Sequence, residues 1–558
     1  MRTSRCSLLI AGLMVLSGTT CSTDSVVIGI NVINLPSDTS ALFVSSVLDN
    51  GTSAQSATFL QQLNHFTIQV PISKIGSGNM VISASALASD RCKLASGRTD
   101  IVIRSDNTPV EAELKLIPLT AKQCTQIKKI NPPVGPVSGG IPVSIDGENF
   151  SDGTLVTIAG TPATNIQVIS PTKITAILPV SFATVGAAPV SIKTPEGGSA
   201  TRSDLFSYYQ LNFQSSSFPV GVQPSAIATA DLNNDTKKDV VVANYGSANV
   251  SVLLGDGTGQ LGTMNNSNSA TGSCPRALHA ADYDGDGYHD LIVVNECSNN
   301  VSVMIGSKNG LFMNRVEYPA DTAASSVPNA IAAGDLTGDG KVDLAITNLG
   351  TKNVALLTRG TAATFTGPTS FALSASPLGV AIGDFNSDGK NDLAVSLYGG
   401  NSVSILKNLG AGSFSVTGTN QVTSKPDCVT IGDFNQDGRL DLAVANNGAP
   451  VVSILIGNGD GTFAPANNFQ AGDTPYSIVV EDFTGDGRAD LAVANYGSNS
   501  VSLLVGDGVG GFISQSSFVV GKNPHSVAAA DFNLDGKQDI VVANSGDNSI
   551  TVLLNKSK

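Results

Sequence analysis

Residues 433–446 read DFNQDGRLDLAVAN, a loop of alternating oxygen-bearing side chains that runs directly into an apolar segment. Asp433, Asn435, Asp437 and Asp441 stand at odd positions of this loop, and Gly438 permits a sharp turn between the last two. The apolar segment has the length of one buried β-strand. The stretch therefore predicts a loop that can hold a cation, followed by a strand.

The same pattern occurs seven times, at intervals of 49 to 53 residues. Each copy has a proline seven residues upstream, an apolar strand immediately downstream and a second strand after a short turn, and in the first six copies a Gly-rich turn and a fourth short strand follow. Four short strands per repeat cannot bury both faces alone, so such units stack around an axis as propeller blades. The seven loops begin at Asp231, Asp282, Asp335, Asp384, Asp433, Asp482 and Asp531.

The seventh repeat ends at the C-terminus after only three strands. A segment upstream of the first repeat, residues 211–221, reads LNFQSSSFPVG and matches the fourth-strand pattern of the other repeats. Pairing of this segment with the last repeat would remove an exposed sheet edge. We therefore predict that residues 211–221 form the outer strand of the seventh blade.

These repeats, over residues 210–558, resemble FG-GAP or VCBS repeats, the units of the integrin α-subunit propeller and of many bacterial surface proteins. Residues 128–209 carry P-x-x-G-P-x-x-G-G, then G-x-N-F and a terminal F-S-Y, and resemble the IPT/TIG immunoglobulin-like domain, whose members are mostly spacer and interaction modules. Residues 21–127 alternate apolar and polar residues, which predicts a further β-sandwich of unidentified family. The expected fold is all-β, a seven-bladed β-propeller preceded by two immunoglobulin-like β-sandwich domains.

Alternating oxygen ligands with a glycine between them suit calcium, which takes six to eight hard oxygen ligands. The spacing resembles the first half of an EF-hand loop, with the ninth position closing the site, so we expect up to seven calcium ions. A hydrogen-bonded turn without metal is the alternative. The candidate side-chain ligands are Asp231, Asn233, Asp235, Asp239; Asp282, Asp284, Asp286, Asp290; Asp335, Thr337, Asp339, Asp343; Asp384, Asn386, Asp388, Asp392; Asp433, Asn435, Asp437, Asp441; Asp482, Thr484, Asp486, Asp490; and Asp531, Asn533, Asp535, Asp539.

The first loop departs from this pattern, because Thr236 stands where the others have glycine and two lysines follow it. A β-branched residue at positive φ is strained, and nearby cations lower the affinity for a metal ion. We therefore expect the first loop to be a weak or empty site. Seven Ca²⁺ ions would add 14 positive charges to a chain of formal charge −14.

The face opposite the metal loops is where the repeats differ most in sequence. Loops on a rigid scaffold commonly carry recognition, and by resemblance the integrin propeller presents ligand-binding loops on its metal-free face. The alternative is that the tyrosines of this face only pack the bases of their loops. The candidate ligand-face residues are Tyr245, Arg276, Tyr398, Tyr476, Tyr496 and His525.

The N-terminus has a basic start, a short apolar segment and small residues, which predicts a secretory signal peptide over residues 1–20. Cys21 is a candidate lipidation site; simple cleavage and release is the alternative. Candidate disulfides are Cys92 with Cys124 and, bracketing a predicted hairpin, Cys274 with Cys297. Cys428 has no expected partner and is predicted to be a buried, inert thiol.

The function expected from these features is non-catalytic: a secreted or surface-anchored calcium-binding protein that adheres to a protein or glycan ligand. We expect a monomer in the periplasm or on the outer surface, contacting membrane only through a lipid anchor. A charge of −14 without a basic stripe argues against nucleic acid. The alternatives are a polysaccharide-acting lyase or hydrolase and a purely structural envelope component. The absence of tryptophan and the presence of only four histidines weigh against the enzyme.

Overall fold

The computed structural model describes the backbone of eight strands within residues 25–123, and residues 124–557 except 182–184, 196 and 263–264. By its internal contacts the chain divides into two units, of which the first comprises residues 1–130, 142–179 and 188–205. The second comprises residues 131–141, 180–187 and 206–558. Among the described residues, no helix has the length and apolar character needed to cross a membrane.

The first unit consists of four antiparallel or mixed sheets. Its N-terminal part has a three-stranded sheet of order β4-β1-β7, in which β1 and β7 run parallel, and a five-stranded sheet of order β3-β2-β5-β6-β8. These strands are β1 (Ser25–Ile33), β2 (Ala41–Leu48), β3 (Ser53–Leu60), β4 (His65–Pro71), β5 (Gly78–Leu87), β6 (Lys93–Ile103), β7 (Val110–Lys115) and β8 (Ile117–Gln123).

Two further four-stranded sheets follow, with orders β14-β15-β11-β9 and β13-β12-β17-β18. Alternate residues of β11 are buried, and Ile145, Ile158, Ile174 and Val190 are fully buried. This alternation of buried and more exposed residues produces the apolar–polar alternation in the sequence that predicted a sandwich. The strands are β9 (Gln126–Asn131), β11 (Pro142–Glu148), β12 (Leu155–Ile158), β13 (Thr161–Pro162), β14 (Thr164–Ser170), β15 (Lys173–Ile177), β17 (Val190–Lys193) and β18 (Ser199–Arg202).

The second unit contains a small sheet of order β10-β19-β16 and seven four-stranded sheets, here numbered blades 1 to 7. The small sheet consists of β10 (Val134–Pro136), β16 (Gly186–Ala187) and β19 (Ser207–Tyr209). Blades 1 to 3 are β21 (Pro224–Ala230), β22 (Asp239–Asn244), β23 (Asn249–Leu253), β24 (Asn265–Ala270); β25 (Pro275–Ala281), β26 (Asp290–Asn295), β27 (Asn300–Ile305), β28 (Met313–Pro319); and β29 (Pro328–Gly334), β30 (Asp343–Asn348), β31 (Asn353–Arg359), β32 (Phe365–Ala372).

Blades 4 to 7 repeat the same order of strands, with one short 3₁₀ helix, η2 (Tyr398–Gly400), in blade 4. Their strands are β33 (Pro377–Gly383), β34 (Asp392–Leu397), β35 (Ser402–Gly410), β36 (Ser413–Gln421); β37 (Pro426–Gly432), β38 (Asp441–Asn446), β39 (Val451–Leu455), β40 (Asn467–Gln470); β41 (Pro475–Glu481), β42 (Asp490–Asn495), β43 (Ser500–Gly506), β44 (Phe512–Val519); and β45 (Pro524–Ala530), β46 (Asp539–Asn544), β47 (Ser549–Asn555), β20 (Phe213–Pro219).

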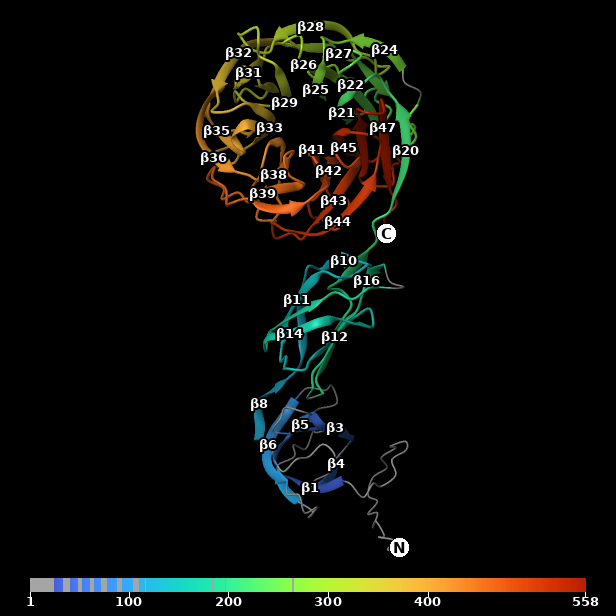
Figure 1. The fold of residues 1–558 in the computed structure, drawn as a ribbon, viewed down its shortest axis with the longest axis vertical. Coiled ribbons are helices and arrows are strands. Elements are labelled where there is room, and N and C mark those ends of the chain that lie inside the picture. Colours follow the sequence, from blue (N-terminus) through green and yellow to red (C-terminus); the bar gives the residue numbers. More distant parts are fainter. Residues whose placement is uncertain are drawn as a thin grey trace. The chain divides into compact units, whose positions relative to one another are not determined.

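The blades surround a common centre, and the first strand of each blade lies toward that centre (Figure 1). Consecutive first strands contact one another, and β45 of blade 7 contacts β21 of blade 1 in the same way. Strand β20 pairs antiparallel with β47 from Phe213 opposite Asn555 to Pro219 opposite Ser549. The prediction that an upstream segment supplies the outer strand of blade 7 is therefore confirmed.

The core of this unit lies between neighbouring blades rather than within one. All six residues of the second strand are buried in every blade, because its two faces pack against two different neighbours. In blade 1, Val240 and Val242 pack against blade 7 whereas Val241 packs against blade 2. Each such apolar side chain contributes about 1.5–3 kcal/mol on burial. A strand buried on both faces explains the continuous apolar runs in the sequence.

Candidate calcium loops and axial cluster

Each metal loop folds around its first aspartate. In the fifth loop, Asp433 Oδ1 accepts the N–H of Asp437 at 3.1 Å and Oδ2 accepts the N–H of Gly438 at 2.9 Å. Gln436 and Gly438 adopt positive φ values of 58° and 80°. The turn therefore brings the odd-numbered side chains of the loop to one side, as the sequence pattern predicts.

The ninth-position aspartate is fully buried, which the sequence did not reveal. Asp441 Oδ2 accepts the N–H of Phe434 at 2.8 Å, and Oδ1 accepts the N–H of Gly457 at 2.7 Å. It therefore fastens the loop to the turn between strands three and four, sixteen residues later. The equivalent residues, Asp239, Asp290, Asp343, Asp392, Asp490 and Asp539, make the same two bonds.

Burial raises the pKa of six of these aspartates, because the charged carboxylate is poorly solvated: Asp239, Asp290, Asp392, Asp441, Asp490 and Asp539. It raises the pKa of Asp490 to about 7 and that of Asp539 to about 6. The nearby carboxylates of Asp486 and Asp482 raise the pKa of Asp490 further. A bound cation would oppose both effects, so the electrostatics of these loops suit a metal ion.

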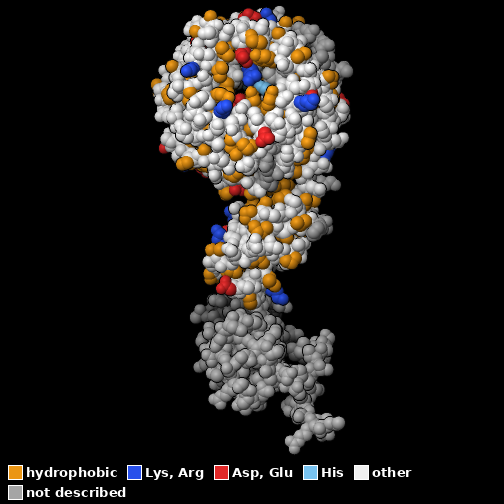
Figure 2. All heavy atoms as spheres, viewed as in Figure 1, with side chains coloured by type: hydrophobic (Ala, Val, Ile, Leu, Met, Phe, Trp, Pro, Cys, Tyr) orange, Lys and Arg blue, Asp and Glu red, His pale blue; other side chains and the backbone are white. Residues whose placement is uncertain are grey.

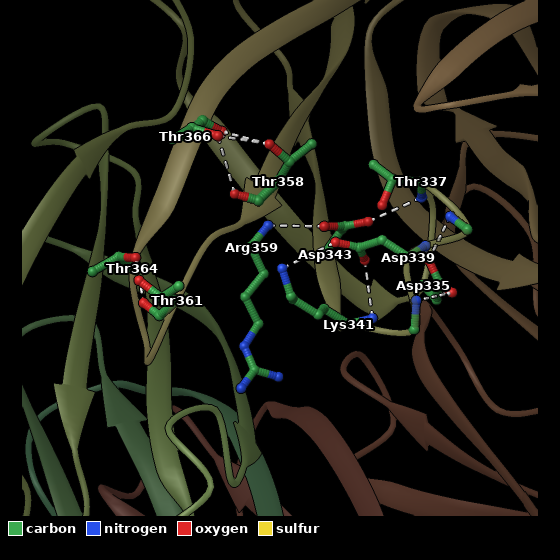
Figure 3. Close-up of polar contacts among 12 residues, drawn as sticks. Asp335, Thr337, Asp339, Lys341, Asp343, Thr358, Arg359, Thr361, Thr364 and Thr366 are labelled. Atoms are coloured by element: carbon green, nitrogen blue, oxygen red, sulfur yellow. Dashed lines mark hydrogen bonds and ion pairs between the residues drawn. The ribbon is translucent and has the colours of Figure 1, made fainter.

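Two loops bring three carboxylates within 4.8 Å of one another among the described residues: Asp282, Asp284 and Asp290, and Asp335, Asp339 and Asp343. Figure 3 shows the second of these groups, with Thr337 and Lys341 beside it. In other loops Asn386 Oδ1 and Asp486 Oδ2 are buried without a hydrogen-bond donor. Orphaned oxygens of this kind fit a hard cation, so the residues present are compatible with calcium.

Lysine side chains pair with the fifth-position aspartate in several loops. The Nζ–Oδ2 distances are 3.2 Å for Lys341 with Asp339 and 3.4 Å for Lys237 with Asp235. Exposed ion pairs of this kind contribute only about 0.2–1 kcal/mol. In the first loop the expected backbone strain is also present, because Thr236 has a φ of 70°.

The metal loops also join neighbouring blades. The N–H of Gly510 in blade 6 donates to the carbonyl of Phe434 in the blade 5 loop at 3.0 Å. The side chain of Gln436 donates from that loop to the carbonyl of Gly487 in the next loop at 3.1 Å. The N–H of Gly259 in blade 1 makes the corresponding bond to Phe532 in blade 7 at 3.0 Å. Order in one loop therefore supports the contact between two blades.

At the opposite end of the first strands, the same backbone hydrogen bond recurs in all seven blades and holds side chains of five different types. The residue after the second strand, here the exit residue, donates its N–H to the carbonyl of the residue before the first-strand proline, at 2.9–3.0 Å. The exit residues are Tyr245, Glu296, Leu349, Tyr398, Asn447, Tyr496 and Ser545. The post-proline residues beside them are Ser225, Arg276, Asn329, Leu378, Asp427, Tyr476 and His525.

Polar and aromatic members of these two sets contact one another around the propeller axis. Arg276 Nε lies 3.1 Å from Asn329 Oδ1 and 3.8 Å from Glu296 Oε2. The ring centroid of Tyr476 lies 4.5 Å from that of His525 and 5.3 Å from that of Tyr496. We name Arg276, Glu296, Asn329, Asp427, Tyr476, Tyr496 and His525 the axial cluster. Figure 2 shows basic, acidic and histidine side chains together at the centre of the propeller's visible face.

Two titratable groups of the axial cluster are strongly perturbed. Burial raises the pKa of Asp427 to about 7, although the charge of Arg276 opposes this. Burial, assisted by the charge of Arg276, lowers the pKa of His525 to about 3. His525 Nδ1 lies 2.7 Å from the carbonyl of Ser225, which can only accept, so Nδ1 carries the proton and Nε2 is an acceptor.

Of the predicted ligand-face residues, the structure brings Arg276, Tyr476, Tyr496 and His525 into the axial cluster. Tyr245 joins it through Glu296, whose Oε1 lies 3.5 Å from the tyrosine hydroxyl. Tyr398 does not join; its ring faces Lys425 Nζ, 5.8 Å from the centroid. Sequence reasoning missed Asp427 and Glu296, although aligning the seven repeats in register would have found them.

Comparison with known proteins identifies both kinds of domain. The model of the FG-GAP-like repeat matches six overlapping segments, at 231–293, 282–346, 335–395, 384–444, 433–493 and 482–542. Together they span 231–542, more than half of the 558 residues. The chain belongs to the FG-GAP-like repeat family. The IPT/TIG domain model matches residues 125–208, so both resemblances found in the sequence are confirmed.

No curated protein matches this FG-GAP-like repeat protein. Similar solved structures include virginiamycin B lyase from Staphylococcus aureus, with 17% identity, a TM-score of 0.43, and coverage of 62% of this chain and 99% of the lyase. An auxiliary nutrient binding protein from Bacteroides ovatus has 14% identity, a TM-score of 0.36, and coverage of 79% and 100%. A lectin from Agrocybe aegerita has 16% identity, a TM-score of 0.39, and coverage of 72% and 97%. These similarities are too distant to carry an argument about function.

The cysteines of the FG-GAP-like repeats pair as expected, although Cys428 is half-buried rather than buried. Cys274 and Cys297 form a disulfide, with their Cα atoms 5.3 Å apart. Cys428 is free and half-buried, and burial raises its pKa to about 11, which fits an inert thiol. Cys124 is disulfide-bonded, whereas its predicted partner Cys92, the lipidation candidate Cys21 and the signal peptide lie outside the described residues.

Proposed function

We propose that this FG-GAP-like repeat protein is a calcium-stabilised, non-catalytic binding protein of the cell envelope or cell exterior. Its propeller would bind a protein or glycan ligand through the face that carries the axial cluster. Secretion through a signal peptide, with or without a lipid anchor at Cys21, belongs to the same proposal. So do a monomeric state and the lack of a nucleic-acid partner.

One observation carries this proposal: the ninth-position side chain at one end of the blades is the same in every blade, whereas the side chains at the other end differ between blades. At the metal-loop end, the ninth-position aspartate and both of its hydrogen bonds recur in all seven blades. At the other end, an equally regular backbone bond holds side chains of five types, namely tyrosine in three blades and glutamate, leucine, asparagine and serine in one blade each. Invariant geometry with variable side chains is typical of a recognition surface on a rigid scaffold.

Calcium enters the proposal through the loops. The residues that would hold it are the odd-position side chains, for example Asp282, Asp284 and Asp290, whose oxygens already converge. The bound ion would supply positive charge among clustered carboxylates. Because neighbouring loops and turns are hydrogen-bonded, this charge would stabilise the contacts between blades.

Screening of glycans and surface proteins tests the proposal. The full-length protein should bind a ligand in calcium, and Tyr476→Ala should weaken this binding without lowering the unfolding temperature. Binding should be weaker in EDTA, because the loops would lose their ions. A ligand that binds Tyr476→Ala as well as it binds the parent protein would contradict the assignment of this face.

A second candidate function, a polysaccharide-acting lyase or hydrolase, is favoured by one feature of the axial cluster. The pKa of Asp427 is raised to about 7, so part of this carboxyl keeps its proton at neutral pH, whereas His525 is uncharged with Nε2 as an acceptor. An acid and a base with separated pKa values are what general acid–base catalysis requires. Turnover of a polysaccharide by the purified protein, abolished in Asp427→Asn, would establish the enzyme and overturn the non-catalytic proposal. A purely structural envelope component is the third candidate, supported if no ligand and no turnover are found.

A further inference from the structure

The axial cluster contains a single permanent cation. Among the fourteen post-proline and exit residues, only Arg276 is basic at neutral pH, since His525 stays neutral. Its side chain is 23% exposed. Its charge also acts on Asp427, Tyr476 and His525 of blades 5 to 7, although Arg276 itself belongs to blade 2. The guanidinium therefore lies near side chains from several blades.

The nearby acidic side chains do not fully neutralise this guanidinium. Glu296 approaches Nε only to 3.8 Å, longer than a charge-assisted hydrogen bond. Glu296 also lies 3.5 Å from the hydroxyl of Tyr245. Burial raises the pKa of Asp427, the other acid of the cluster, to about 7, so its carboxyl group is only partly ionised near neutral pH. The guanidinium also hydrogen-bonds Asn329 and the hydroxyl of Tyr476, but neither of these partners is an anion at neutral pH. The arginine can therefore bind one carboxylate of a ligand.

Next to the cation lies an aromatic surface. Tyr476 contacts both Tyr496 and His525, and Tyr496 and His525 are themselves 6.4 Å apart between ring centroids. Flat aromatic surfaces pack well against the apolar C–H face of a sugar ring. Two groups beside these rings can bond hydroxyls: the carboxyl of Asp427, which also accepts from the amide of Asn447 at 3.4 Å, and the Nε2 acceptor of His525.

Blade 2 also holds its charged pair in place covalently. The disulfide joins Cys274, two residues before Arg276, to Cys297, the residue after Glu296. It is the one disulfide among the described residues of the seven blades, and it lies in the blade that carries the arginine. A disulfide at this position limits the backbone motion of both charged residues, as a preorganised binding site for an ion requires.

We infer that the axial cluster binds a sugar ring that carries one carboxylate, such as a hexuronic acid, with Arg276 on the carboxylate and Tyr476 and Tyr496 against the ring. This inference rests on the proposed function and specifies its ligand class. A single cation on a protein of charge −14 disfavours an extended polyanion. The site therefore binds a single acidic sugar, either free or as the terminal sugar of a glycan.

Calorimetric titration of the full-length protein in calcium tests this inference. Glucuronic and galacturonic acid should bind at least about 10-fold more tightly than glucose and galactose, because only the acids engage the guanidinium. The methyl glycosides of the acids distinguish the two sources: equal or tighter binding indicates a glycan end, and loss of binding indicates the free sugar acid. N-acetyl amino acids test a carboxylate without a sugar ring.

Variants assign the effect to residues. Arg276→Met should remove the preference for acids over neutral sugars, whereas Arg276→Lys should retain part of it. Tyr476→Ala should weaken the binding of acidic and neutral sugars to the same extent. Lys522→Met removes an exposed cation near the same end of the blades and should change nothing. If Arg276→Met fails to fold, the comparison of acidic with neutral sugars on the parent protein still tests whether the site prefers a carboxylate.

Four results would overturn the inference: neutral sugars binding as tightly as acids, neither class binding, N-acetyl amino acids binding as tightly as the sugar acids, or a preference for acids that persists in Arg276→Met. In each case the proposed function would still stand if another ligand from the wider screen binds the parent protein but not Tyr476→Ala. A preference for acids that persists in Arg276→Met would place the carboxylate elsewhere. Failure of the ligand class and failure of the binding face therefore give different results.

Discussion

Replacement of the buried ninth-position aspartate should destabilise the propeller even without calcium. Asp441 is 0% exposed, and its two oxygens accept the N–H groups of Phe434 and Gly457. Asp441→Ala leaves both N–H groups buried without an acceptor. At about 1–3 kcal/mol for each orphaned donor, the free energy of unfolding should fall by about 2–6 kcal/mol.

Two further variants separate this structural role from metal binding. Asp441→Asn keeps one acceptor oxygen, so its cost should be about half as large. Asp437→Ala changes an exposed residue of the same loop and should alter stability by no more than about 0.5 kcal/mol in EDTA. In calcium, however, Asp437→Ala should reduce the stabilisation that the ion provides, because it removes a ligand.

Guanidinium denaturation in EDTA and in calcium, followed by circular dichroism, measures all three variants. The expected order of destabilisation in EDTA is Asp441→Ala, then Asp441→Asn, then Asp437→Ala. Equal effects of Asp441→Ala and Asp437→Ala in EDTA would refute the reasoning. That result would mean that the ninth aspartate serves the ion alone.

Three other predictions concern pH, backbone strain and the free thiol. In EDTA, stability should rise as pH falls from about 7 to about 5. Asp427, Asp490 and Asp539 have raised pKa values, so the folded chain binds more protons at these residues than the unfolded chain, whose aspartates titrate near about 3.9. The lowered pKa of His525 acts in the opposite direction, but it is one group against three. An unfolding temperature that falls over this range would contradict the prediction. Thr236→Gly should stabilise the propeller by about 1–2 kcal/mol in chemical denaturation, because Thr236 has a φ of 70°, whereas Thr337→Gly, at a position without positive φ, should not. Cys428 should react with a thiol reagent only after unfolding, because burial raises its pKa to about 11, and rapid labelling of the native protein would show the opposite.

The repeat was readable from the sequence because its signals are local. A proline seven residues before each loop marks where a first strand begins, and the apolar run after each loop marks a strand buried on both sides. Even the supply of the last outer strand by residues upstream of the repeats followed from pattern matching, and β20 pairs with β47 as predicted. Spacing also placed Cys274 and Cys297 opposite each other across a hairpin.

The candidate site was only partly predictable. The ninth-position aspartate looked like a ligand, yet its burial and its bond to a turn sixteen residues away depend on strands that pair later in the blade. Tyr398 matched the tyrosines of other repeats, but it packs with Lys425 instead of joining the axial cluster. Asp427 and Glu296 carried no local signal of function.

The sequence by itself determined the number of repeats, the strands in each, and the loops whose oxygens converge, because these depend on neighbours along the chain. Only the tertiary structure decided which side chains meet at the axis. The second strand of each blade packs on two neighbouring blades, and this packing places seven first strands around one centre. Arg276, Asp427 and His525 are therefore neighbours in space, although each lies in a different repeat.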